Sequence, residues 1–182
     1  MMIQTDNTAA LTADYLYHQC VMQASFREVE QASVWYHEAY LLAQEIASNM
    51  TIDIERAACI VSAFSIRQRW SVNVRKALEY SIGIEPKGLF NCIAIADASL
   101  VHGFDAVKGQ KTNAFARAIA GDPNAVVIDV WMCRAGGLDR DDPNKSQYNM
   151  LADAVRNIAS EHGLTPRTTQ ALIWIVKRGS HA

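Results

Sequence analysis

The chain has 182 residues, of which 50% are hydrophobic and 20% are charged, and its formal net charge at pH 7 is −2. These values are ordinary for a soluble globular protein that forms one domain or one compact two-lobed unit, and the near-neutral charge gives no overall attraction to nucleic acid. No apolar run reaches the roughly 18 residues needed to cross a bilayer, and the N-terminus lacks the order of a signal peptide, so we expect a cytoplasmic location.

Helical periodicity dominates the first two thirds of the sequence. Residues 26–50 place their apolar side chains near one stripe, which predicts a long amphipathic helix. Asp53 is a cap-type residue ahead of a run that is strongly apolar from Ala57 to Phe64, as in a central buried helix. Two further helices are expected over residues 69–82 and 89–101.

The last third continues in the same way around one polar stretch. A helix over 111–120 stops at Gly121, and an apolar return leads to Asp129, which is placed to cap a short helix. Residues 136–146 are rich in turn formers and are the expected mobile loop. Two more helices follow, with Thr165 and Pro166 at the start of the second. The sequence therefore predicts an all-α fold of about eight or nine helices.

This fold is expected to be a single domain over residues 1–182. Within it, we expect N-terminal helices over residues 1–52, a core over 53–135 and C-terminal helices over 146–179. The core contains Lys111 and Asp129. Trp35 and Trp174 lie on apolar stripes of their helices and are expected in the hydrophobic interior.

Lys111 and Asp129 stand at the two ends of a segment that can fold back on itself. The helix over 111–120 is roughly 15 Å long at ~1.5 Å per residue, and the return over 121–128 covers up to about 26 Å at ~3.3 Å per residue. Both residues would then lie at helix N-termini, where the dipole favours a carboxylate and disfavours an ammonium. A neutral lysine can act as a nucleophile while the carboxylate offsets developing positive charge. The alternative is a plain helix cap and a solvated lysine.

Charge and cysteine content narrow the possible ligands. Residues 1–56 hold eight acidic and two basic side chains, whereas residues 67–117 hold eight basic and four acidic ones. One basic face is sufficient for phosphate binding, and a random clustering of solvated charges is the alternative. The cysteines form no CxxC pair, so we expect no metal, no iron–sulfur cluster and no other cofactor, and we expect the thiols to act as small core residues. They are Cys20, Cys59, Cys92 and Cys133.

The stretch GQKTNAFARAIAGDPNAVVIDVWMCRA resembles the core of the helix-hairpin-helix DNA glycosylase superfamily, of the endonuclease III type. The family signature is a hairpin ending in Gly-x-Lys-Thr, a helix, an apolar return, and an aspartate before a helix that carries arginine. The sequence follows it without a gap from Gly109 to Arg134, including the 18-residue step from lysine to aspartate. Residues 60–77 and 171–179 resemble the early helix–loop–helix of the family and its late helix.

This resemblance implies a two-lobed arrangement with a central cleft, and DNA as the partner, double-stranded with one base extruded. It places Lys111 on the Schiff-base lysine of the family and Asp129 on its catalytic aspartate. The hairpin departs from the family, because DAVKG replaces Leu-Pro-Gly-Val-Gly and keeps only Gly109. Val107 takes the place of a glycine that lets the backbone approach a phosphate, and Lys108 partly substitutes as a point charge.

Further DNA contacts are implied around this core. Arg67, Gln68 and Arg69 fall in the loop that matches the DNA-facing one, where an amide or aromatic wedge fills the gap of an extruded base. The alternative is that Trp70 begins a helix and packs in the core. Thr112 belongs to the hairpin motif. Arg134 lies one turn after Asp129, where it would orient that carboxylate, hold a phosphate, or remain a plain surface arginine.

Four functions remain open from the sequence. The first is a DNA base-processing enzyme that excises an extruded base and has AP-lyase activity. The second is a phage-type transferase that attaches an amino acid or amine to a modified thymine. The third is a non-catalytic DNA-binding module, and the fourth is a helical interaction protein with a partner on the acidic N-terminal helix.

Overall fold

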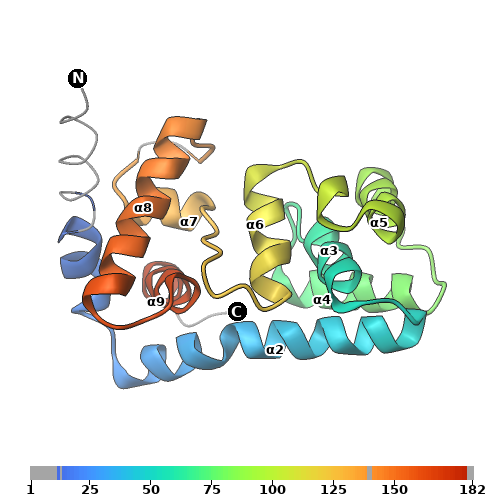
Figure 1. Ribbon diagram of the computed structural model, residues 1–182, viewed down its shortest axis with the longest axis horizontal. Helices are drawn as coiled ribbons and strands as arrows, with labels where there is room; N and C mark the ends of the chain where they lie inside the picture. The colour runs from blue at the N-terminus through green and yellow to red at the C-terminus, as the bar shows by residue number, and fades with distance from the viewer. Residues whose placement is uncertain (1–11, 13, 139–140, 180–182) are drawn as a thin grey trace. The chain divides into compact units, whose positions relative to one another are not determined.

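The computed structural model describes residues 12, 14–138 and 141–179, and every regular element within them is helical (Figure 1). The predicted all-α fold class is confirmed. The expected N-terminal helices fall partly on residues 1–11 and 13, and the expected loop over 136–146 includes residues 139–140, all of which lie outside the described residues. No single helix in the described part of the chain is long and apolar enough to span a membrane.

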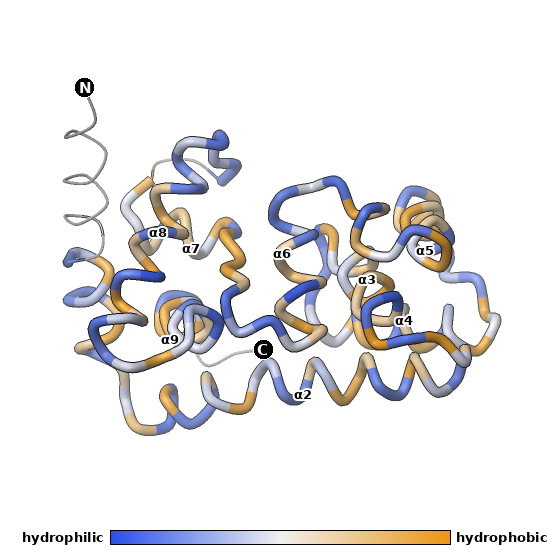
Figure 2. The backbone as a smooth tube through the Cα atoms, in the orientation of Figure 1, coloured by the Kyte–Doolittle hydropathy of each residue, from blue (hydrophilic) through white to orange (hydrophobic). Residues whose placement is uncertain are grey.

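The chain divides into two compact units, each of which is described by itself. The terminal unit comprises the chain up to Tyr36 and the chain from Pro123 through the last described helix, and the central unit is His37–Asp122. The first boundary falls within helix α2 (Phe26–Met50), which therefore contributes side chains to both units. Figure 2 shows hydrophobic and hydrophilic residues alternating turn by turn along α2, as predicted for an amphipathic helix.

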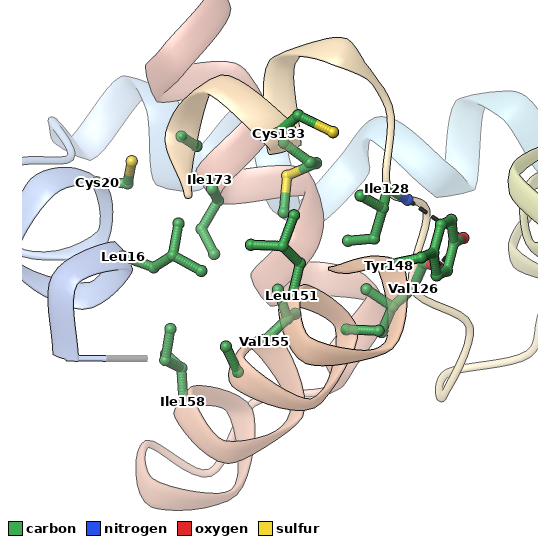
Figure 3. Packing of buried hydrophobic residues seen from close by; sticks show 14 residues of the cluster. Leu16, Cys20, Val126, Ile128, Cys133, Tyr148, Leu151, Val155, Ile158 and Ile173 are labelled. Carbon is green, nitrogen blue, oxygen red and sulfur yellow. Dashed lines mark hydrogen bonds between the residues drawn. The ribbon is translucent and has the colours of Figure 1, made fainter. Parts of the chain in front are cut away.

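The terminal unit is built around α9, against which its other elements pack. These elements are η1 (Tyr17–Val21), α7 (Val130–Ala135), α8 (Lys145–Glu161) and α9 itself (Pro166–Arg178). Figure 3 shows the apolar side chains that they bury between them. The largest fully buried members of this cluster are Leu16, Ile128, Met132, Leu151, Ile158 and Ile173.

Local signals define where the helices of the terminal unit begin. Asn144 and Gln147 form a capping box at the start of α8, in which each side chain accepts from the backbone N–H of the other residue. Thr165 caps α9 through the backbone N–H of Thr168, and Pro166 is the first helical residue, as predicted. These contacts satisfy N–H groups that a helix leaves without an internal partner.

The central unit is built around α3, which packs against each of the elements that follow it in this unit. Its elements after α2 are α3 (Ile54–Phe64), α4 (Trp70–Ser81), α5 (Phe90–His102), η2 (Gly103–Ala106) and α6 (Gln110–Ile119). Asp53 caps α3 through the backbone N–H of Arg56, and every residue from Ala57 to Phe64 is buried. The prediction of a central buried helix is confirmed.

A buried extended segment leads into α7. Ala125–Ile128 are each at most 7% exposed, as their apolar side chains predicted, and Figure 2 shows this stretch as hydrophobic. The hydroxyl of Tyr148, on α8, donates to the Val126 carbonyl at 2.9 Å and accepts from the Ile128 N–H at 3.3 Å (Figure 3). One side chain thus supplies both a donor and an acceptor to a backbone that has no neighbouring strand among the described residues.

We predict that Tyr148→Phe destabilises the protein at neutral pH and weakens its loss of stability in alkali. At pH 7 the free energy of unfolding should fall by about 1–3 kcal/mol, because two buried backbone groups lose their partner. Burial is the main cause that raises the pKa of Tyr148 to about 12. Since a tyrosine in an unfolded chain titrates near 10, this contribution is complete below pH 10 and is lost as the pH rises to about 12.

Urea unfolding followed by circular dichroism, in a pH series from 7 to the alkaline limit of reversibility, measures both effects. Some alkaline loss should remain in the variant, because burial also raises the pKa of Cys59, Tyr36 and Tyr80. If the unfolding free energy of Tyr148→Phe depended on pH as that of the wild type does, Tyr148 would not contribute to the alkaline loss of stability.

Candidate functional site

Asp129 is the N-cap of α7, as predicted, and three donors hold its carboxylate. Oδ1 accepts from the backbone N–H groups of Trp131 at 2.9 Å and Met132 at 3.0 Å. Oδ2 accepts from the indole Nε1–H of Trp174 at 2.9 Å. Because the first two donors belong to α7 and the third to α9, two elements fix the orientation of this carboxylate.

Trp174 is the partner of Asp129 that the sequence analysis missed. The expectation that Trp35 and Trp174 are interior residues is only partly right, since both are half-buried. Their rings pack with centroids 5.7 Å apart, and the Arg178 guanidinium lies 4.6 Å from the centroid of the Trp174 ring. A half-buried indole needs an acceptor for its N–H, and Asp129 supplies it.

A second aromatic group lies in the electrostatic field of this carboxylate. Tyr36 is 5% exposed, and its hydroxyl donates to Oε1 of the buried Gln170 at 2.7 Å. Burial, followed by the negative charge of Asp129, raises the pKa of Tyr36 well above its usual range. The phenol therefore stays protonated and donates. The sequence signal that could have identified Tyr36 is its polar hydroxyl at an inward-facing position of an amphipathic helix.

Lys111 lies in the first turn of α6, in the central unit. The preceding turn, Val107–Gly109, joins the segments Phe90–Ala106 and Gln110–Ile119, which meet at 91°. The side chain of Lys111 is exposed, and it forms no ion pair with any described residue. A three-residue turn with a glycine and a near-perpendicular crossing is the geometry of a helix–turn–helix unit.

Asn113 holds this turn, although the sequence analysis did not single it out. Its Nδ2 donates to the carbonyls of Phe104 at 2.8 Å and Val107 at 3.0 Å, and its Oδ1 accepts from Arg117 Nε at 2.9 Å. The Arg117 guanidinium in turn lies 4.4 Å from the centroid of the Phe104 ring. Val107 is 3% exposed and packs in the core.

The other hairpin residues differ in exposure and contacts. Lys108 and Gly109 are exposed, and the backbone carbonyl of Gly109 accepts from the N–H of Asn113 and from the Thr112 hydroxyl at 3.0 Å. The Thr112 carbonyl accepts from Ser62 Oγ on α3 at 2.7 Å. The Thr112 side chain is thus engaged with its own helix start.

The loop between α3 and α4 presents two arginines. Arg67 and Arg69 are exposed, Gln68 is half-buried, and Arg67 adopts a left-handed backbone conformation with φ of 55°. Trp70 is the first residue of α4, and its ring meets Phe115 of α6 edge-on with centroids 6.4 Å apart. Trp70 thus begins a helix, as one alternative predicted, but it is half-buried and does not lie in the core. The wedge role of this loop stays a prediction.

Arg134 does not contact Asp129. Its Nη2 donates to both carboxylate oxygens of Asp141, at 3.0 and 3.4 Å, and its guanidinium lies 5.0 Å from the centroid of the Trp131 ring. The hypothesis that Arg134 orients the Asp129 carboxylate is therefore wrong, because the donors that hold this carboxylate are Trp174 and the α7 backbone.

The predicted site residues form two groups. In the central unit, the start of α6 and the loop before α4 are linked through the Ser62–Thr112 hydrogen bond and the Trp70–Phe115 contact. The terminal unit carries Asp129 and Arg134 on α7. Because Lys111 and Asp129 belong to different units, their juxtaposition stays a prediction.

The acidic, thiol and imidazole groups give no sign of a metal centre in the described part of the chain. No group of three or more such side chains there is arranged to hold a metal ion. All four cysteines are buried and free, which confirms that they act as small core residues.

Residues 4–181 match a protein family described as a family of unknown function (DUF7178), and the chain belongs to this family. No curated protein and no solved structure matches the chain.

We predict that Asp129 and Trp174 are energetically coupled. Trp174→Phe removes the indole donor and Asp129→Asn sets an amide N–H₂ against it, so each change should lower the free energy of unfolding by about 1–3 kcal/mol. The loss of unfolding free energy in the double variant should be smaller than the sum of the two single losses. The double variant has neither a carboxylate without its indole donor nor an indole N–H that faces an amide N–H₂. Urea unfolding of the four proteins measures the coupling.

Trp35→Phe is the matched control, since it makes the same indole-to-phenyl change at the half-buried ring that packs beside Trp174. Its effect on the free energy of unfolding should add to that of Asp129→Asn. If the effects of Trp174→Phe and Asp129→Asn were also additive, the hydrogen bond between these residues would not contribute to stability.

Proposed function

We propose that this protein is a DNA base-processing enzyme of the helix-hairpin-helix glycosylase type, with Lys111 as nucleophile and Asp129 as the stabilising carboxylate. The observation that carries the proposal is the 18-residue spacing of Lys111 and Asp129 in a segment that resembles the glycosylase core. Asp129 is oriented by three donors at the start of α7, while Lys111 is exposed in the first turn of α6 without an ion pair to a described residue. A fixed carboxylate and an available amine are the two groups that imine chemistry requires.

The chemistry of the proposal uses these two groups on one extruded nucleotide. Neutral Lys111 Nζ attacks C1′ of the deoxyribose, the C1′–N bond breaks, and its electron pair leaves with the base, which takes up a proton. The C1′–O4′ bond then opens with protonation of O4′, and Nζ gives up both of its protons as a neutral imine forms between Nζ and C1′, which balances the protons taken up by the base and by O4′. Asp129 stabilises the positive charge on the sugar and accepts the amine proton.

The distribution of unpaired cations supports a nucleic-acid substrate. Of the basic residues in the central unit, Arg75 and Lys76 pair with Glu79, and Arg117 is bound to Asn113. Four exposed cations at the hairpin and at the loop before α4 form no ion pair with described residues: Arg67, Arg69, Lys108 and Lys111. Such cations are available to replace the counterions of a DNA backbone.

The hairpin also supports the proposal. Gly109 precedes the first turn of α6, and Asn113 holds the preceding turn in shape through two backbone carbonyls. With Val107 buried, the exposed part of the turn is Lys108 and Gly109. Phosphate contact by this hairpin therefore depends on the Lys108 ammonium more than on backbone approach.

We predict a covalent adduct between Lys111 and DNA. Borohydride reduction in the presence of a duplex that contains an abasic site should trap the protein on the DNA, because it reduces the imine to a stable amine. Lys111→Ala should abolish the adduct, and Asp129→Asn should slow its formation by at least about tenfold, given the cost of losing a positioned charge at a reacting centre. Denaturing electrophoresis measures the trapped fraction.

Lys87→Ala is the matched control, since Lys87 is an exposed lysine of the same unit outside the proposed site. It should trap at the wild-type rate. DNA binding without any adduct would reject the lyase and leave the base-modifying transferase or the non-catalytic module. An adduct that persists in Lys111→Ala would assign the nucleophile elsewhere.

We predict that Arg67 and Arg69 contact DNA phosphates. The double variant Arg67→Gln/Arg69→Gln should weaken DNA binding similarly for unrelated sequences and lower the slope of log Kd against log salt by about two, since each phosphate contact contributes about 0.9. Fluorescence anisotropy over a salt series measures the slope. Lys87→Gln should leave it unchanged, and an unchanged slope in the double variant would remove this loop from the interface.

A further inference from the structure

Arg134 makes an ion pair that differs from the others in the described part of the chain. The other ion pairs there join side chains three or four residues apart, as expected on the surface of one helix. Arg134 instead pairs with Asp141, seven residues later and beyond the end of α7. This contact is therefore set by the path of the chain after α7 and not by helical spacing.

The guanidinium of Arg134 also contacts an aromatic ring. It lies 5.0 Å from the centroid of the half-buried Trp131 ring, and the Trp131 backbone N–H is one of the donors to Asp129. Arg134 thus sits one helical turn from the carboxylate that the proposed function makes catalytic. A guanidinium held against an aromatic ring next to the proposed reacting centre is suited to bind an oxyanion.

Asp141 presents such an oxyanion. Both of its carboxylate oxygens accept from Nη2 of Arg134, at 3.0 and 3.4 Å. Two oxygens on one planar acid group resemble the two non-bridging oxygens of a phosphodiester. The side chains of Arg134 and Asp141 are 46% and 69% exposed, so an incoming anion has access to the pair.

We propose that Arg134 is a phosphodiester-binding residue and that Asp141 occupies its guanidinium in the unbound protein. DNA binding then exchanges the carboxylate for a backbone phosphate next to Asp129. This inference rests on the proposed function, which it extends by naming one phosphate contact and an internal competitor for it. Because the pair is exposed, the competition is weak, and its loss should change DNA affinity by only about two- to fivefold.

Asp141→Asn in the full chain tests the exchange. With a duplex carrying a stable abasic-site analogue at low salt, its Kd should be about two- to fivefold lower than that of the wild type, and the gain should shrink as salt screens the pair. Arg134→Gln should raise Kd. In the double variant Asp141→Asn/Arg134→Gln, the gain from Asp141→Asn should disappear, because there is no guanidinium to release.

Asp153→Asn is the matched control. Asp153 pairs with Arg156 on α8 at 2.8 Å, with side chains 57% and 48% exposed, so this variant makes the same change of net charge at a pair of similar exposure. Equal gains in Asp141→Asn and Asp153→Asn, or a gain that survives in the Arg134→Gln background, would overturn the inference while leaving the proposed function intact. Absence of DNA binding by the wild type and every variant would overturn both.

Discussion

The position of Asp129 depends on how a buried extended segment satisfies its backbone in a unit made of helices. Ala125–Ile128 cannot pair with a strand, and an unpaired buried N–H or carbonyl is costly. The Tyr148 hydroxyl resolves this by donating to Val126 and accepting from Ile128. The direction in which the chain enters α7 is thereby fixed from α8, and with it the place of the carboxylate that caps α7.

The second constraint is the hydrogen bond from the indole of Trp174, through which α9 also holds the Asp129 carboxylate. Asp129 receives donors from the backbone ahead of it and from a side chain 45 residues away. Its charge is strong enough at this site to contribute to the raised pKa of both Tyr36 and Tyr148. The surroundings of the carboxylate are therefore aromatic and donor-rich, which suits the role that we propose for it, holding a negative charge while positive charge develops on a sugar.

Local chemistry explains why the elements could be predicted. Asp53, Asn144, Thr165 and Asp129 all cap the helices that follow them, because a cap is decided within three residues of the sequence. The partners that build the candidate site could not be predicted in this way. Hydrophobic periodicity shows that a residue points inward, but it does not identify the polar atom that it will meet.

Particular residues show this limit. Trp174 lies on an apolar stripe and was expected to pack like any core residue, yet its N–H is bound to Asp129. Arg134 follows Asp129 by one turn, and the sequence left a contact with Asp129, a phosphate contact and a plain surface position open, whereas the structure pairs the guanidinium with Asp141. Both outcomes depend on contacts between segments that no short window of sequence contains.

The reactivity of the buried cysteines reports how often each unit of the protein unfolds. Cys20 and Cys133 lie in the terminal unit and Cys59 and Cys92 in the central unit, and none is more than 6% exposed. A thiolate must reach solvent before an alkylating reagent can react with it, so modification of each pair reports how often its own unit unfolds. Ligands that rigidify one unit would then protect two thiols and leave the other two reactive.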